Sequence, residues 1–191
     1  MQSRTICIRV VAATSHRGGI DTARPLLMID FLTLLRRDHH DLELGLDELL
    51  QAVTVQQLRG ALDGVRLGLT AHAEAEDIVL CAALMKAQRR DALEPHIGRA
   101  RDAHLALEGS LASLVCARPG TPAWRERARF LRIMVHDHAC YEEETVVPAV
   151  RELAPEVYGT LAGQFATERL RQLAMLQPSA PIYIAELAQA C

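Results

Sequence analysis

The chain has 191 residues, of which half are hydrophobic and 4% aromatic, and its formal net charge is −3. This length has room for one domain and a tail, and the excess of alanine and leucine over aromatic residues favours helices. We expect neither a nucleic-acid nor a membrane partner, because the sequence has no basic block and no apolar run near the roughly 18 residues of a membrane span. The five cysteines are scattered and form no CxxC pair, which favours a reducing cytoplasm over a disulfide scaffold.

The spacing of apolar residues predicts an all-α protein. We expect an irregular N-terminal arm over 1–25, a helical domain over 26–152 and a C-terminal helical tail over 153–191. Helical periodicity predicts helices at 26–53, 54–87, 91–117, 121–147 and 156–176. Because the first four are each about 25 residues long and their links are short, they fit an antiparallel up-down four-helix bundle.

Three residues mark the ends of these helices. Thr54 is suited to cap the second helix. Thr121 followed by Pro122 is typical of a helix start, where proline is tolerated in the first turn. Pro148 is expected to kink or end the fourth helix, because its ring blocks the regular hydrogen-bond ladder.

Each of the four long helices carries one histidine within its apolar face. These are His39, His72, His104 and His138. The first two are separated by 33 residues and the last two by 34, so the second half of the domain echoes the first. The segment HAEAEDIVLCAAL, which begins at residue 72, aligns with HACYEEETVVPAV, which begins at residue 138. Two related hairpins packed face to face would bring the four histidines to one level.

Every one of these histidines is followed by a glutamate four residues later, on the same helix face. The pairs are His39/Glu43, His72/Glu76, His104/Glu108 and His138/Glu142. With eight histidines and 14 glutamates in the chain, chance predicts only about 0.6 such pairs. A buried carboxylate is costly unless it is paired or binds a metal. Mixed nitrogen and carboxylate ligands suit iron or manganese, and zinc less exclusively.

The set of motifs resembles a known family. The pattern H…HxxxE…H…HxxxE in a four-helix bundle, with HACYEEETVVPAV in the last helix and RRDHHDLELGLDELL in the first, is similar to the hemerythrin-like, or HHE cation-binding, domain. The resemblance covers about residues 28–152. It implies a non-haem centre of two iron ions, with manganese and zinc as weaker alternatives. It also implies that His39, His72, Glu76, His104, His138 and Glu142 bind the metals, and that the two glutamates bridge them.

Other polar residues near these motifs have weaker claims. His136 lies about 200° round the helix from His138, and His40 is also off the apolar stripe, so both are expected outside the ligand set. Glu43 and Glu108 are interpreted as groups at the solvent edge, or as partners for the second nitrogen of a ligating histidine on another helix. Tyr141 is expected in the core or at its edge, from where it could approach the metals. A ferritin-like centre is disfavoured, because no histidine has a glutamate three residues before it.

Three functions remain open at this point. The first is a di-iron protein that binds or reacts with oxygen, nitric oxide or peroxide, as a sensor, a carrier, an iron-handling protein or a weak peroxidase. The second is an iron-responsive regulatory or iron-delivery protein whose metal-dependent fold is recognised by a protein partner through the tail after Pro155. The third is a helical bundle without metal, which would leave the polar stripe unexplained.

Overall fold

The computed structural model describes residues 29–176, and every regular element among them is helical. Both the expected arm at 1–25 and the last part of the C-terminal tail lie outside these residues. The elements are α1 (Phe31–Gln51), α2 (Val55–Lys86), α3 (Arg90–Val115), α4 (Pro122–Tyr141), a π-helical turn η1 (Glu142–Val146), α5 (Val147–Leu153) and α6 (Pro155–Leu176). None of the helices in this described part is both long and apolar enough to span a membrane.

The predicted helix starts at Thr54 and Thr121 are confirmed. The Thr54 side chain accepts a hydrogen bond from the backbone N–H of Gln57 at 3.2 Å, and the Gln57 side chain accepts from the backbone N–H of Thr54 at 3.0 Å, which closes a capping box. The Thr121 hydroxyl accepts from the backbone N–H of Trp124, with Pro122 in the first turn. The first helix begins later than predicted, at Phe31, because the preceding residue, Asp30, is extended.

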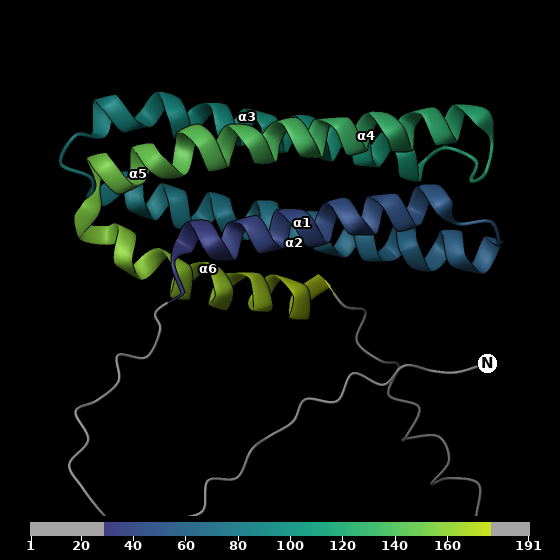
Figure 1. The fold of residues 1–191 in the computed structure, drawn as a ribbon, viewed down its shortest axis with the longest axis horizontal. Coiled ribbons are helices and arrows are strands. Elements are labelled where there is room, and N and C mark those ends of the chain that lie inside the picture. Colours follow the sequence, from purple (N-terminus) through teal and green to yellow (C-terminus); the bar gives the residue numbers. More distant parts are fainter. Residues whose placement is uncertain (1–28, 177–191) are drawn as a thin grey trace, which may run out of the picture.

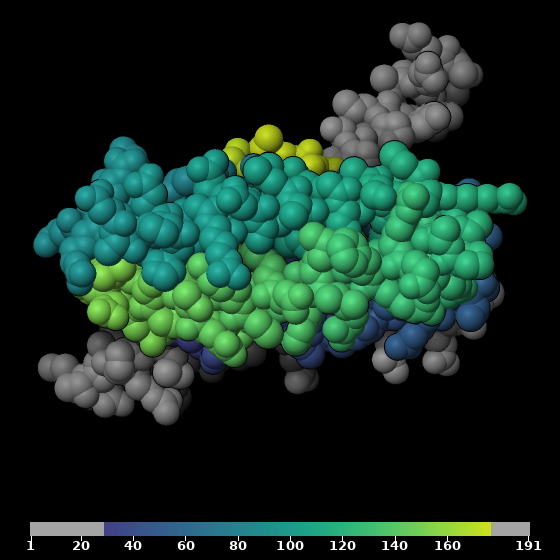
Figure 2. Space-filling model, turned by 90° about the horizontal axis from the view of Figure 1, so that it is seen from above, coloured from purple at the N-terminus to yellow at the C-terminus, as the bar shows by residue number. Residues whose placement is uncertain are grey.

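Helices α1 to α4 pack side by side in two layers, α3 with α4 and α1 with α2 (Figure 1). Helices α1 and α3 run in one direction, and α2 and α4 in the other (Figure 1). Helix α6 returns under the lower layer and packs mainly on α2 and also on α1. The opposite face is made by α3 and α4 along its length (Figure 2). One long side of the α1–α4 assembly is therefore covered by a further helix.

The apolar core is divided into two clusters. One is centred on Phe31, Leu35, Val79 and Phe165, near α5 and α6. The other surrounds Trp124 and lies towards the α1–α2 and α3–α4 connections. On each helix the apolar-stripe histidine falls between residues of the two clusters, so a polar layer separates them. Such a layer inside a core is costly unless something satisfies its polar atoms.

The fourth helix does not end at Pro148, although ending there was one of the two outcomes predicted for this residue. Instead, α4 widens into the π-helical turn Glu142–Val146 and then continues as α5 to Leu153. Proline has no N–H to donate, and its ring crowds the carbonyl four residues earlier, on Glu144. The wider turn accommodates that crowding without breaking the helix, and such turns are frequent at functional sites.

Candidate metal centre

The six predicted site residues all lie in the polar layer, and all are at most 5% exposed. His39 comes from α1, His72 and Glu76 from α2, His104 from α3, His138 from α4 and Glu142 from η1. Each histidine has a buried apolar residue of one or both clusters one turn away on its helix, and each glutamate lies between its histidine and a buried apolar residue of one cluster. The local helical pattern of the sequence is therefore sufficient to direct all six side chains inward.

Five of the six offer donor atoms that lie within 4.8 Å of one another: His39, His72, Glu76, His138 and Glu142. The Nε2 atoms of His39 and His138 are each 3.2 Å from Oε2 of Glu142, and Nε2 of His72 is 3.3 Å from Oε2 of Glu76. His104 stands beside this group. Its Nε2 lies 3.2 Å from Nε2 of His138, 3.7 Å from Glu142 and 3.9 Å from Glu76.

The inward-facing atoms of this cluster lack hydrogen-bond partners among the described residues. Both carboxylate oxygens of Glu76 and of Glu142, and Nε2 of His39 and of His72, are buried and unpaired in this way. Buried carboxylate oxygens without donors are rare, since each carries the full desolvation penalty. Lone pairs that converge from carboxylates and imidazoles are what a cation needs, so the residues present fit a metal centre.

On the outside of the cluster, three histidines have a carboxylate on their second ring nitrogen. The Nδ1–H groups of His72, His104 and His39 donate to Asp38, Asp77 and Glu143, each at 2.9 Å. Such a bond fixes the tautomer, leaves Nε2 with its lone pair directed inward, and is typical of histidines that bind metals. This outer layer therefore also indicates a metal centre.

The hemerythrin HHE cation-binding domain model matches residues 30–150. The chain belongs to this family. It is also 29% identical over 118 residues to a DNA nickase from Nostoc sp. (strain PCC 7120), an alignment that covers 62% of this chain and 32% of that protein. The chain thus spans about a third of the length of this relative. No solved structure matches the chain.

As a hemerythrin-family domain the chain is expected to bind metal cations, typically iron, and the histidine–glutamate cluster is where its structure offers ligands. Residues 30–150 contain all six cluster residues and end within α5. Helix α6 lies beyond the matched region. Its contribution to the centre is therefore not covered by the family match.

Helix α6 reaches the centre through Arg169 and Phe165. The Arg169 guanidinium donates to both oxygens of Asp38, at 2.7 Å from Nε and 2.6 Å from Nη2, and Asp38 in turn holds His72. Although burial acts to raise it, the pKa of Asp38 is lowered by His72 and Arg169. The Phe165 ring packs edge-on against His72, with 5.9 Å between ring centroids. The outer side of His72 is therefore closed by α6.

The outer carboxylates are the functional residues that the sequence analysis missed. Glu43 and Glu108 were interpreted as solvent-edge groups or as partners of ligating histidines, and they lie at the solvent edge: Glu43 accepts a hydrogen bond from Nδ1 of the exposed His136 at 2.7 Å, and Glu108 is exposed. Glu143, which directly follows Glu142 in the chain, is 21% exposed and contacts His39. A signal was present in the sequence. Each true partner directly precedes or follows a cluster residue in the chain, in the strings DH, ED and EE.

The charges in the metal-free cluster are balanced by protons. Burial opposes charging of His39, yet the Glu142 carboxylate 3.2 Å from its Nε2 and the Glu143 carboxylate on its Nδ1 raise its pKa to about 10. Burial likewise opposes charging of His104, whose pKa is raised to about 9 by Asp77 and by the buried glutamates. Burial and the neighbouring Glu76 charge raise the pKa of Glu142 to about 8. Cation binding would displace these protons, so metal uptake and proton release are linked.

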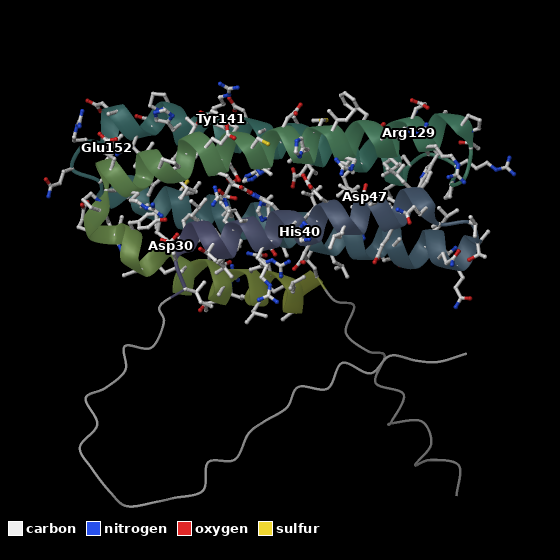
Figure 3. All side chains as sticks on the ribbon, viewed as in Figure 1. Asp30, His40, Asp47, Arg129, Tyr141 and Glu152 are labelled. Carbon is white, nitrogen blue, oxygen red and sulfur yellow. The ribbon has the colours of Figure 1, made fainter. Side chains whose placement is uncertain are left out.

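The remaining candidates lie at the edge of the centre. His40 and His136 are exposed, as predicted from their helix phase. Tyr141 is half-buried, with the Arg99 guanidinium 4.1 Å above its ring. Figure 3 shows Tyr141 near the end of α4 in the upper layer and His40 on α1 in the lower layer. Tyr141 thus lies at the core edge, beside a pocket of about 240 Å³ that His138 also lines.

Proposed function

We propose that this protein holds a non-haem di-iron centre in an antiparallel four-helix bundle of α1 to α4, and that the centre binds or reacts with oxygen, nitric oxide or peroxide. The ligands are His39, His72, Glu76, His104, His138 and Glu142. The two glutamates would bridge the ions, because both oxygens of each are buried without donors among the described residues. These unpaired carboxylates are the observation that carries the proposal.

The chain's own residues have three tasks in this function. The inward Nε2 atoms and carboxylates bind the ions, and the outer carboxylates orient the imidazoles. The two apolar clusters exclude bulk water from both ends of the layer. Two irons supply reversible one-electron redox chemistry at each ion. Four histidines and two carboxylates leave coordination positions free, as reactive metal sites require.

The small size of the expected ligand follows from burial. The six residues are at most 5% exposed, so there is no room for a bulky organic substrate beside their inward-facing donor atoms. A diatomic molecule or a peroxide can reach them by small side-chain movements, and one pocket beside His138 and another beside His39 are open spaces next to the centre. Oxygen, nitric oxide and peroxide are thus the chemical class that the centre suits.

Iron content and spectra of protein purified without chelator test this proposal. We expect about two irons per chain, with absorption bands of a ferric pair that change on exposure to oxygen, nitric oxide or peroxide. The variants His72→Ala and His138→Ala should lose iron, whereas His136→Ala, an exposed histidine on the same helix as His138, should keep it. Unchanged iron in both ligand variants would refute the assignment.

A second function is favoured by the link between α6 and His72. An iron-responsive regulatory or iron-delivery protein needs a surface element that changes with metal occupancy. Helix α6 contacts the centre through Arg169 and Asp38, so release of His72 from the metal would change the contacts of this helix. Limited proteolysis with and without iron tests this role. Faster cleavage within α6 in the metal-free protein is expected, and equal cleavage rates would exclude it.

Nucleic acid is not proposed as a partner, although one relative is named a DNA nickase. The alignment covers only a third of that protein, and the present chain is acidic overall. A supercoiled plasmid incubated with the iron-loaded protein and a radical scavenger is expected to stay intact. Nicking that disappears in Glu142→Ala would reverse this view.

A further inference from the structure

One histidine of the centre differs from the other three. Nδ1 of His138 is buried and has no hydrogen-bond partner among the described residues, whereas His39, His72 and His104 each have a carboxylate at 2.9 Å. The His138 residue is only 5% exposed. A buried N–H without an acceptor is costly, because it has lost its hydrogen bonds to water and gained none. This atom therefore calls for a partner from outside the described chain.

The three existing carboxylates follow one rotational order around the helices. Asp38 on α1 serves α2, Asp77 on α2 serves α3, and Glu143 on η1 serves α1. The missing step is from α3 to α4. Helices α1 and α3 run in the same direction (Figure 1), and Asp38 directly precedes the α1 histidine. The equivalent position on α3 directly precedes His104, and it is Ala103.

A pocket occupies the position where a fourth carboxylate would lie. Ala103 and His138 both line the space of about 240 Å³ between α3 and α4. Arg99 and Tyr141 also line it, with the guanidinium stacked on the ring at 4.1 Å. Met134 adds an apolar wall. An aspartate at position 103 would extend into this space, and the methyl group of alanine leaves it open.

We propose that this pocket binds a small monocarboxylate, which accepts a hydrogen bond from Nδ1–H of His138 and pairs with the Arg99 guanidinium. The proposal rests on the proposed function, because Nδ1 must carry the hydrogen when Nε2 binds iron. A bound carboxylate completes the outer layer as the fourth member of the set. The binding site thereby gives small organic acids a direct influence on one iron ligand.

The pocket lining selects the ligand class. Asp137 also lines it, so a second negative charge on the ligand would be repelled and a monoanion is preferred. The apolar wall at Met134 suits a short aliphatic chain such as that of acetate or propionate. Water could also accept the hydrogen bond, but it would not form an ion pair with Arg99. A comparison of the affinities for acetate and for neutral acetamide distinguishes a carboxylate site from a water site.

Calorimetric titration of the iron-loaded full chain with acetate tests the proposal. We expect one saturable site per chain, and at least ten-fold weaker binding of acetamide. Ala103→Leu fills the pocket without an acceptor, and Ala103→Asp supplies the missing carboxylate from the chain itself. Both variants should weaken acetate binding at least ten-fold. Ala103→Asp should also shift the iron absorption bands in the direction that acetate shifts them in the unmodified protein, whereas Ala103→Leu should not.

The other outcomes are decisive as well. Acetate bound directly to iron would bind Ala103→Leu as tightly as the unmodified protein, and that result overturns the proposal. No saturable binding to the unmodified protein overturns it too, as does equal binding of acetamide, which would indicate a neutral occupant such as water. Iron content is measured first on each sample. Absence of iron refutes the proposed function. Absence of acetate binding to the iron-loaded protein refutes only the proposed carboxylate site.

Discussion

The two sides of the polar layer differ in the hydrogen-bond partners of their histidines. On the α1–α2 side, both histidines have a carboxylate that is itself paired with an arginine: His72 with Asp38 and Arg169, and His39 with Glu143 and Arg36. Helix α6 covers this side. On the α3–α4 side, the partner of His104 is a half-exposed aspartate with Arg101 4.0 Å away, and His138 has none in the described chain.

This difference suggests that one side holds the metal ligands in position and that the other lets small molecules reach the metals. Hydrogen bonds that continue from imidazole to carboxylate to guanidinium restrict ligand movement. On the side with fewer such bonds the histidines are held less firmly, and their movement gives small molecules a route inward. We infer that the α1–α2 side holds the geometry of the centre and that the α3–α4 side exchanges ligands with solvent. The four experiments below test this division.

The largest effect is expected from Glu142, which contacts histidines of both sides. Glu142→Ala should reduce iron from about two to less than one per chain, because loss of a bridging carboxylate leaves both ions short of a ligand. Metal analysis and the ferric absorption bands measure this. Glu144→Ala is the matched control. It lies in the same π turn but is exposed, so its effect on stability should stay within about 0.5 kcal/mol. If Glu144→Ala loses iron and Glu142→Ala keeps it, the face of this turn that we assign to the metal centre is wrong.

Removal of the metal should come next in size. The metal-free protein keeps two buried carboxylates close together, so we expect it to be less stable than the iron-loaded protein by several kcal/mol. Thermal unfolding of chelator-treated and iron-loaded samples at equal pH measures the difference. Hydrogen exchange would sharpen the comparison, with the larger loss of protection expected on the α3–α4 side, where fewer outer contacts remain. Equal melting temperatures would count against a buried centre.

Some features of the centre can be predicted from the sequence, and others cannot. Helical periodicity places His39 and Glu142 correctly inside, because the phase of a regular helix is a local property. It does not reveal that Asp38 serves a histidine on another helix, since that contact depends on how α1 and α2 are rotated against each other. The π turn was also missed, because Pro148 permits either a break or a wider turn. The link from Arg169 is a contact across 131 residues, which no local pattern contains.

The two sides can be compared directly with a pair of amide substitutions. Asp38→Asn should weaken iron binding by about 10- to 100-fold, the usual range for loss of an outer carboxylate. Asp77→Asn should cost less than ten-fold, because the Asp77 side chain is 32% exposed and water can replace it. Competition with a chelator of known affinity measures both. The same loss in the two variants would remove the distinction between a positioning side and an open side.

The smallest effect is expected from Arg169, which acts on the centre only through Asp38. Arg169→Gln should weaken iron binding by a few-fold, because Asp38 then keeps His72 as its charged partner but loses two short contacts from the guanidinium. Arg169→Lys should recover part of the loss, since a lysine preserves the charge but not the two-point contact. Arg171→Gln on the same helix is the control, as its partner is the nearby Glu168 rather than the centre. The charge-transfer spectrum distinguishes the proposed role from a general loosening of α6. A shifted band in Arg169→Gln, with the Arg171→Gln spectrum unchanged, requires a path from α6 to His72. If both variants lower the melting temperature and neither moves the band, α6 supports the fold without influencing the metal.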